Sequence, residues 1–544
     1  MIVQLCLNLN IHQNNFSLHQ NSFSPHQNSF FPHQNNFFIN ENNLCLHHRR
    51  FHTLSLSNDN KNKYRAIYPP WKEICRRISS YSVCDASSVL DEWEEEGNTV
   101  TKWEIGQILR EMRKLNKHHP ALQVCDWMNN REERFGFSAS DAAVQMDLIS
   151  KVHGVASAEE YFRSLKNVLK DRKTYCSLLN VYAHSRLKEK AESLLHTMRT
   201  KGYAINSLPF NVMMTMYLNL KEYDKVETLV SEMIQANVKL DLYSYNIWLS
   251  SRGSQGSAKK MEETYELLTK DRTVVPNWTT FSTVAKSYTK MGHFEKAEEY
   301  IRKVETTIEG RNRIPFHYLL TLYGNIGKKE EVYRVWNIYK LIFRRVTNLG
   351  YLAFMSSLVR LGDIEGAENL YEEWLSVKSS YDSRIGDHLL GWYAKKGDTN
   401  KALEFFKQMA KSGQNLYSST WEILSEVHIC NQRISEALSC LKEAFMVGAP
   451  KTWRPNPVKV SALFELCRKQ DDMESAETLI GLLRQSGFLE DEVYASLIGL
   501  SDGTIGKVGL SIKTDRVDRI NNIYEDENTD DDVSEVVCVQ PTRG

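Results

Sequence analysis

Residues 208–241 read LPFNVMMTMYLNLKEYDKVETLVSEMIQANVKLD, and stretches of the same design recur along most of the chain. When they are aligned with the aromatic residue as the fourth member, the twentieth members lie 35, 35, 36, 35, 35, 35, 35 and 39 residues apart. A fixed period in this range is the signature of a solenoid of stacked repeats. The fourth members are Tyr175, Phe210, Tyr245, Phe281, Phe316, Tyr351, Gly386, Trp421 and Val460, and the twentieth members are Ala191, Val226, Met261, Ala297, Val332, Ala367, Ala402, Ala437 and Ala476.

Each repeat is expected to fold as a helical hairpin. Two apolar faces with i, i+3, i+4, i+7 spacing predict two helices, and small residues at the twentieth position let the helices approach closely. In the repeat beginning at residue 172 these faces are Tyr175, Leu178, Leu179, Tyr182 and Ala191, Leu194, Leu195, Met198. Glycine often occupies the fifteenth position, where it can end the first helix with a positive φ. These glycines are Gly256, Gly292, Gly327, Gly362 and Gly397.

The composition bounds the class of protein. The 544 residues are 42% hydrophobic and 25% charged, and no run of eighteen apolar residues predicts a membrane span. The ten cysteines occur singly without a CxxC pair, so neither a zinc knuckle nor a thioredoxin-type site is indicated. The net charge is zero, and residues 61–500 carry a surplus of five basic side chains. Charge alone would therefore not suggest a nucleic-acid partner.

The two ends differ from the repeats. Residues 1–60 contain two acids and repeat HQN[NS]F every seven residues from His12 to Phe37. An acid-poor leader rich in Asn and Ser is typical of an organelle transit peptide, whereas metal binding by its histidines is disfavoured because nothing organises them. At the other end, residues 525–535 read EDENTDDDVSE with seven acids, which predicts a self-repelling, disordered tail.

The repeats resemble those of the pentatricopeptide repeat family, P class, rather than the 34-residue tetratricopeptide repeat. The 35-residue period, the aromatic–Asn pairs Phe210–Asn211 and Tyr245–Asn246, and the Asn or Asp that ends many repeats carry the resemblance. The runs PPWKEICRRIS (69–79), WMNNREERFGFSASDAA (127–143) and GRNRIPFHYLL (310–320) look like one plant organellar subgroup, associated more with plastids than with mitochondria.

The resemblance implies an all-α fold, a right-handed superhelical α-solenoid of about 10–11 stacked hairpins. It predicts a leader at 1–60, a helical region with one degenerate repeat at 61–138, the array at 139–491 and an acidic tail at 492–544. The predicted repeats are 139–171, 172–206, 207–241, 242–277, 278–312, 313–347, 348–382, 383–417, 418–456 and 457–491.

The resemblance also implies that each hairpin reads one base of single-stranded RNA through its fifth and last residues. Asn211 with Asp241 resembles a uracil reader, and Asn246 with Asn277 resembles a pyrimidine reader. Ser282 with Asn312 resembles an adenine reader, and Ser461 with Asp491 a guanine reader. The pairs Cys176/Asn206, His317/Thr347, Leu352/Asp382 and Asp387/Tyr417 depart from the pattern, and Glu422 has no assigned partner because its repeat is 39 residues long.

The thirteenth position is cationic in four repeats. Lys290, Arg360, Lys395 and Lys469 would form a row suited to the phosphate backbone, which this position faces in the family. A solvated cation at a helix C-terminus is the alternative, since the helix macrodipole also favours it. The terminal Asn and Asp residues could likewise be helix caps, a role that does not exclude reading.

The sequence lacks an HxE…CxxC pattern, a P-loop, a GxGxxG loop and a nuclease-like carboxylate cluster, so no enzyme, cofactor or metal is expected. We expect a monomer that binds organellar RNA and acts by occupying its site, with the plastid favoured over the mitochondrion. RNA-processing or ribosomal proteins are further possible partners. The alternative is a protein-binding scaffold, such as one on an organellar ribosome, which could use Trp336, Phe343 and Trp374 if these residues are exposed.

Overall fold

The structure is a computed structural model that describes residues 69–80, 85–412, 416–448, 453–490 and 492–497. The predicted leader and nearly all of the predicted acidic tail lie outside the described residues. The regular elements that the structure describes are α-helices and two short 3₁₀ helices. They divide between two compact parts, Met1–Trp248 and Leu249–Gly544. Among the described residues, none of the helices combines the length and the apolar character needed to cross a bilayer.

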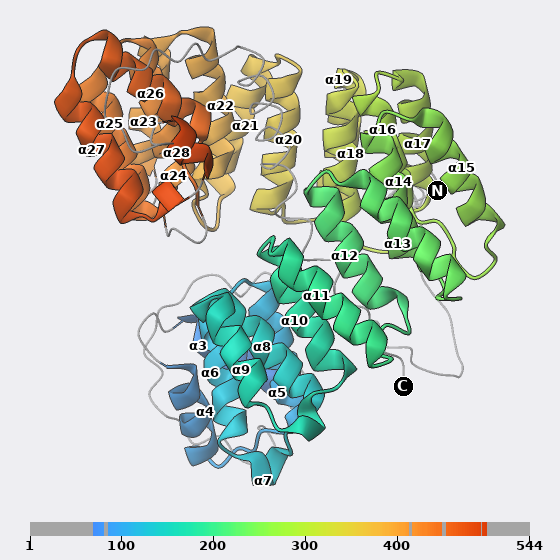
Figure 1. Ribbon diagram of the computed structural model, residues 1–544. Helices are drawn as coiled ribbons and strands as arrows, with labels where there is room; N and C mark the ends of the chain where they lie inside the picture. Colours follow the sequence, from blue (N-terminus) through green and yellow to red (C-terminus); the bar gives the residue numbers. More distant parts are fainter. Residues whose placement is uncertain (1–68, 81–84, 413–415, 449–452, 491, 498–544) are drawn as a thin grey trace, which may run out of the picture. The chain divides into compact units, whose positions relative to one another are not determined.

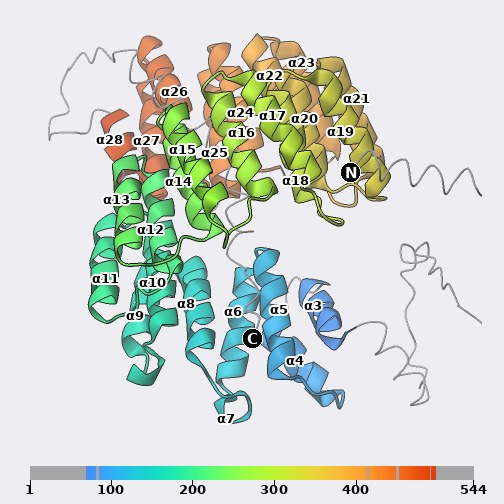
Figure 2. The same ribbon diagram turned by 90° about the vertical axis from the view of Figure 1, so that its right-hand side faces the viewer.

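Within each part the helices follow one another as hairpins (Figures 1 and 2). The first part contains α3 (Pro70–Ser80), α4 (Ala86–Glu95), α5 (Lys102–Lys114), α6 (His118–Asn129), α7 (Glu132–Phe135), α8 (Ala139–His153), α9 (Val155–Ser164), α10 (Arg172–His184), α11 (Lys188–Thr200), α12 (Ser207–Asn219) and α13 (Tyr223–Gln235). Helix α14 (Leu242–Ser254) begins in the first part and ends in the second.

The second part continues the alternation of first and second helices. It contains α15 (Ala258–Lys270), α16 (Trp278–Lys290), α17 (Phe294–Thr306), α18 (Ile314–Asn325), α19 (Lys329–Ile342), α20 (Asn348–Arg360), α21 (Ile364–Val377), α22 (Ser383–Lys396), α23 (Thr399–Ser412), α24 (Ser418–Cys430), α25 (Ile434–Val447), α26 (Pro457–Lys469), α27 (Met473–Gln485) and α28 (Glu492–Leu497). The all-helical, stacked-hairpin fold expected from the period is confirmed.

The apolar spacing accounts for this packing. Helices α12 and α13 each carry apolar residues at positions i, i+3, i+4 and i+7. All of these residues are at most 5% exposed. Each such side chain contributes about 1.5–3 kcal/mol when fully buried, so a hairpin depends on its neighbours to cover both faces. These residues are Phe210, Met213, Met214 and Tyr217 in α12 and Val226, Leu229, Val230 and Met233 in α13.

From the 172–206 repeat onward, the fifteenth position has a left-handed backbone whether or not it is glycine. The expected glycines have φ between 72° and 78°, and Arg186, Lys221, Gln432 and Asp471 have φ between 55° and 59°. In the 207–241 repeat, the N–H of Glu222 donates to the carbonyl of Tyr217 at 2.8 Å, which closes a Schellman-type C-cap around Lys221. The turn therefore comes from the hydrogen-bonded cap, and glycine only lowers its cost.

A repeated polar clamp joins successive hairpins. In the first part, Tyr217 Oη of α12 and Lys225 Nζ of α13 both donate to Glu192 Oε1 of α11, at 2.8 and 2.5 Å. The second part repeats this arrangement at Glu262 with Tyr288 and Lys296, and at Glu368 with Tyr393 and Lys401. Because each clamp spans two repeats, it fixes the register of one hairpin on the next.

The N-terminal region holds two hairpins. Helices α3 and α4 pack with α5 and α6 around one core that includes Ile74, Leu90, Ile105 and Trp127. The second of these hairpins lies within residues 61–138, for which one degenerate repeat is predicted, whereas the α3–α4 hairpin does not follow from the period.

Candidate nucleic-acid interface

The fifth and last residues of a repeat occupy defined places in the structure. The fifth residue lies in the second turn of the first helix. In most repeats the last residue is the N-cap of the next repeat's first helix, but Asn312 lies one residue before the N-cap Arg313. Asn206, Asp241, Asn277, Asp382 and Asn456 all directly precede a first helix. This arrangement sets a potential reading pair at the seam between two hairpins.

Asn211 and Asp241 form a direct pair at one such seam. Asn211 Nδ2 donates to both carboxylate oxygens of Asp241, at 3.1 and 3.2 Å, and Asn211 is 3% exposed. Ser207 Oγ donates to the second carboxylate oxygen at 2.6 Å, and the backbone N–H of Ser244 donates to the first at 2.8 Å. Because an amide carries two N–H groups, these distances fit either one N–H shared between the two oxygens or one N–H donated to each.

The neighbouring predicted readers are placed differently. Cys176 is buried in α10, and burial raises the pKa of its thiol to about 11, so it acts as a small packing residue. Asn206 is exposed at the start of α12 and makes no side-chain capping bond. In the second part, Asn277 Oδ1 accepts from the backbone N–H of Thr279 at 2.9 Å and so caps α16. Asn246 is half-buried in α14.

The pair proposed for adenine, Ser282 and Asn312, does not form a hydrogen bond, and the pair proposed for guanine is described only at Ser461. Ser282 Oγ is buried and has no hydrogen-bond partner among the described residues, while Asn312 Oδ1 accepts from the N–H of Ile314 at 3.1 Å. Ser461 is half-buried in α26. Asp491 lies outside the described residues, so its pairing with Ser461 stays a prediction.

The repeats that depart from the family pattern hold their fifth residues in protein contacts. His317 Nε2 lies 3.2 Å from Tyr339 Oη, and burial lowers the pKa of this imidazole to about 4. Asp387 accepts from Ser419 Oγ and Thr420 Oγ1, both at 2.7 Å, and burial raises the pKa of its carboxyl to about 7. These polar atoms are already satisfied without RNA.

The structure supplies the missing partner of Glu422. A Glu422 carboxylate oxygen accepts the backbone N–H of Asn456, whose own side chain caps α26 by accepting from the N–H of Val458. Burial raises the pKa of Glu422. Asn456 therefore stands where Asp241 stands relative to Asn211, and the extra residues of this repeat precede it in the loop after α25.

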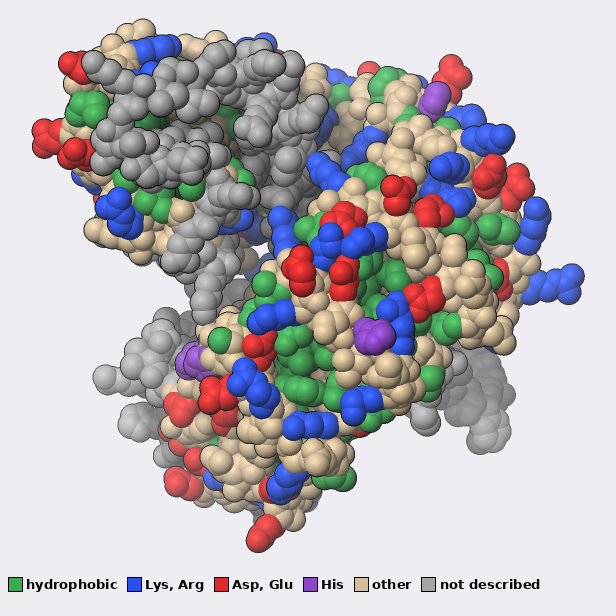
Figure 3. All heavy atoms as spheres, viewed as in Figure 1, with side chains coloured by type: hydrophobic (Ala, Val, Ile, Leu, Met, Phe, Trp, Pro, Cys, Tyr) green, Lys and Arg blue, Asp and Glu red, His purple; other side chains and the backbone are tan. Residues whose placement is uncertain are grey.

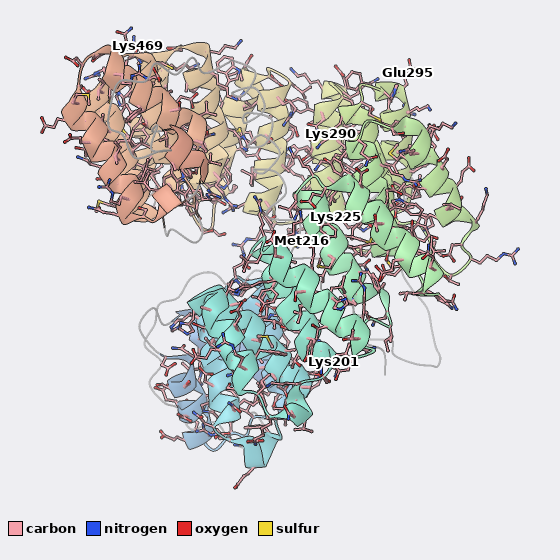
Figure 4. The ribbon with its side chains drawn as sticks, in the orientation of Figure 1. Lys201, Met216, Lys225, Lys290, Glu295 and Lys469 are labelled. Atoms are coloured by element: carbon pink, nitrogen blue, oxygen red, sulfur yellow. The ribbon has the colours of Figure 1, made fainter. Side chains whose placement is uncertain are left out.

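The four predicted backbone-contacting cations lie at the C-terminal ends of first helices and are exposed. Lys290, Arg360 and Lys469 are the last residues of α16, α20 and α26, and Lys395 is next to last in α22. Lys290 and Lys469 are labelled in Figure 4. Their placement suits both phosphate contact and the macrodipole. On the face shown in Figure 3, Lys and Arg side chains are interspersed with Asp and Glu side chains, in keeping with the neutral net charge.

The aromatic residues suggested for a protein-binding surface are buried. Trp336, Phe343 and Trp374 are 2%, 4% and 0% exposed, so the expectation that they form a contact surface is wrong. The ring of Trp336 stacks on Phe354 with centroids 4.5 Å apart, and Phe343 packs edge-on against Phe316. The Trp336–Phe354 contact joins two hairpins, whereas the Phe343–Phe316 contact lies within one. In the described residues, no group of three or more His, Cys, Asp or Glu side chains could hold a metal ion.

Comparison with known proteins agrees with this architecture. The model of the PPR repeat matches residues 173–203, 209–238, 279–306, 351–377 and 388–414, and that of the pentatricopeptide repeat domain matches residues 228–291. A pentatricopeptide repeat-containing protein of Arabidopsis thaliana is 53% identical over 434 residues, which cover 79% of this chain and 83% of that protein. The chain belongs to the pentatricopeptide repeat family.

Other relatives of this pentatricopeptide repeat protein have more specific names. The large ribosomal subunit protein mL101 (rPPR4) of Arabidopsis thaliana is 34% identical over 402 residues, covering 73% of this chain and 82% of that protein. Four further Arabidopsis relatives are named as mitochondrial. Among solved structures, the pentatricopeptide repeat protein PPR10 from maize is 17% identical, with a TM-score of 0.36 over 79% of this chain and 65% of that one.

Proposed function

We propose that this pentatricopeptide repeat protein binds single-stranded RNA in an organelle and reads part of its sequence. The Asn211–Asp241 pair carries the proposal. The fifth and last residues to which the family assigns base reading meet here within 3.2 Å. One N–H shared between the two carboxylate oxygens would leave the other amide N–H for a base. An N–H donor complements a uracil carbonyl, whereas duplex RNA would hide that base edge in a deep groove.

Site occupancy explains how such a protein would act. A stacked array on single-stranded RNA blocks exonucleases, or keeps the strand from pairing so that ribosomes and processing enzymes reach it. No catalytic group, cofactor or metal is needed, and a monomer suffices. RNA processing, stability and translation are all open to this mechanism.

The readable part of the array is limited to some repeats. The polar side-chain atoms of His317, Asp387 and Glu422 form hydrogen bonds within the protein, and the side chain of Leu352 has no polar atom. We therefore assign repeats 313–456 a spacer role, with the exposed cation Arg360 available to the phosphate backbone. The base preferences concentrate in repeats 207–312.

A ribosome-associated scaffold is the second candidate. The similarity to the relative named as a large ribosomal subunit protein extends over 82% of that protein. In repeats 313–456 the fifth residues His317, Asp387 and Glu422 are hydrogen-bonded within the protein, which leaves those hairpins without a base-reading role. A scaffold would be insensitive to changes at Asn211 and Asp241. It would sediment with organellar ribosomal subunits after nuclease treatment.

The organelle is part of the proposal. Several relatives are named as mitochondrial, so the plastid preference expected from the sequence finds no support and the mitochondrion fits as well. Residues 1–60 fused to a fluorescent protein test this point in plant cells. Signal in either organelle supports an organellar role, and signal confined to the cytosol contradicts it.

The binding proposal is tested by fluorescence anisotropy with labelled single-stranded RNA, the same strand in a duplex, and single-stranded DNA at several salt concentrations. We expect tightest binding to single-stranded RNA and a linear fall of log affinity with log salt, with a slope of about −0.7 for each phosphate contact. Equal affinity for duplex and single strand, or no measurable affinity, would refute the proposal.

A further inference from the structure

Ser244 is the third residue of the repeat that follows the Asn211–Asp241 pair, and it is fully buried. Its Oγ lies 2.7 Å from Asn211 Oδ1 and 3.0 Å from Asp241 Oδ1. Its backbone N–H donates to Asp241, and the backbone N–H of Asp241 lies 3.2 Å from Ser244 Oγ. One small side chain thus contacts both members of the candidate reading pair.

These contacts fix which way the Asn211 amide points. A serine hydroxyl has one proton to donate, and Asn211 Oδ1 is its nearest acceptor. With Oδ1 held by Ser244, Nδ2 faces the acceptor-only carboxylate of Asp241. The reverse orientation would place Oδ1 against that carboxylate and leave two buried acceptors facing each other, which is costly at 3% exposure.

In a second place, the fifth residue of one repeat contacts the third residue of the next repeat in the same way. Thr420 Oγ1 lies 2.7 Å from Asp387 Oδ1 and 2.9 Å from the hydroxyl of Ser383, and both Thr420 and Ser383 are fully buried. Ser383 is the first residue of its repeat, as Ser207 is of the repeat that holds Asn211. The hydroxyl at the third position is therefore a recurrent feature of these seams.

In the repeats from residue 172 to residue 456, a fifth-position Asn or Asp is followed by a third-position hydroxyl, and other fifth residues are followed by Pro, Gly, Ile or Lys. The first group is Asn211/Ser244, Asn246/Thr280 and Asp387/Thr420, and the second group is Cys176/Pro209, Ser282/Pro315, His317/Gly350, Leu352/Ile385 and Glu422/Lys459. The 139–171 repeat departs from this pattern, because its fifth residue, Ala143, is followed by Thr174, whose buried hydroxyl donates to the carbonyls of Leu169 and Asp171. Thr280 Oγ1 has no hydrogen-bond partner among the described residues, so the contact itself is shown for Ser244 and Thr420.

We propose that Ser244 is a positioning residue that sets the base preference of the 207–241 repeat by orienting the Asn211 amide. This rests on the proposed RNA binding. Held by Ser244, the amide presents an N–H donor, which complements the O4 acceptor of uracil and opposes the N4 amino group that cytosine carries at the same place. The hydroxyl at the third position is thus a further determinant of recognition beside the fifth and last residues.

The test measures the uracil-to-cytosine affinity ratio at the base that the 207–241 repeat contacts, using the full chain and two RNAs that differ at that base. We expect a ratio of roughly ten for the wild type and for Ser244→Thr, which keeps the hydroxyl. Ser244→Ala is expected to lower the ratio to about two, because Asn211 Oδ1 loses its donor and the amide can turn.

Ser244→Val is the second variant, because it matches Ser244→Thr in shape and lacks the hydroxyl. A lower ratio in Ser244→Val than in Ser244→Thr, at matched unfolding temperatures, assigns the effect to the hydrogen bond. Thr420→Ala is the matched control in another repeat and should leave this ratio unchanged.

An unchanged ratio in Ser244→Ala and Ser244→Val, or a loss in Ser244→Thr equal to that in Ser244→Ala, would overturn the inference while RNA binding stands. A wild type that does not bind RNA would instead overturn the proposed function itself.

Discussion

Asn211 donates from Nδ2 to the carboxylate of Asp241, 30 residues further along the chain, at 3.1 and 3.2 Å. The bond joins the first helix of one hairpin to the N-cap of the next. The same two side chains hold the seam together and, in the proposed function, also present polar atoms to a base. Changes at Asp241 must be judged against both.

Asp241→Asn is expected to shift the preference of its repeat from uracil towards cytosine with little loss of stability. Asparagine caps a helix about as well as aspartate and keeps an acceptor for the Ser244 N–H, but it also adds a donor. Affinities for the two RNAs and the unfolding temperature are the measurements. Asp241→Ala, which removes the cap, should cost about 1 kcal/mol in the free energy of unfolding. The assignment fails if uracil preference is the same in Asp241→Asn as in the wild type.

Replacing Arg360 and Lys469 together by Gln should weaken RNA binding equally for all sequences. Each lost phosphate contact reduces the slope of log affinity against log salt by about 0.7. The slope of the double variant should therefore be about 1.4 smaller in magnitude than that of the wild type. Arg302→Gln is the matched control, since Arg302 is exposed on a second helix and paired with Glu298. A salt slope that changes as much in the control as in the double variant would rule out the cation row.

Acid is expected to loosen the clamps between hairpins. Hydrogen bonding from Lys225, with further help from Tyr217, holds the pKa of Glu192 below its usual value, and Glu262 and Glu368 are lowered in the same way. Carboxylates with lowered folded pKa values stabilise the protein above the unfolded pKa, and this stabilisation is lost as pH falls through the folded value. Glu192→Gln should be less stable at pH 7 and lose less on acidification to pH 3. Identical acid sensitivity in variant and wild type would exclude this role.

Asp387 should have the opposite pH effect. Burial raises its pKa to about 7, so the folded chain keeps a proton that the unfolded chain releases from about pH 4 upward. The free energy of unfolding should therefore fall as pH rises through this interval and level off above pH 7. Asp387→Asn should be more stable than the wild type at pH 8 and should flatten this slope. Urea unfolding between pH 5 and 8 measures it, and parallel curves for the two proteins would contradict the prediction.

The repeat architecture could be predicted because it depends on local patterns. The apolar spacing of α12 and α13 and the small residues at the twentieth position, such as Ala191, specify hairpins that need neighbours. The Schellman turn at Lys221 was not visible in the same way, since its positive φ comes from backbone hydrogen bonds rather than from a glycine.

The candidate site was harder to predict because its polar contacts cross between repeats. Asn456 could not be assigned from the sequence as the partner of Glu422, because this repeat is longer than 35 residues and its last position is not fixed by the period. The hydrogen bond between the two residues identifies it. Ser244 was overlooked because it lies at a helical position where a small polar residue is unremarkable in sequence. Trp336 could form a contact surface only if it were exposed; it instead packs against Phe354 of the following hairpin, a contact that the sequence alone does not reveal.

The most direct test of base reading is selection of the full chain against a random single-stranded RNA pool at controlled salt, followed by sequencing of the retained strands. Repeats 207–312 predict enrichment of uracil, a pyrimidine and adenine at three successive positions. The uracil should move towards cytosine in a parallel selection with Asp241→Asn. Retained pools with no enriched motif, or the same motif for both proteins, would contradict the claim that Asn211 and Asp241 read RNA.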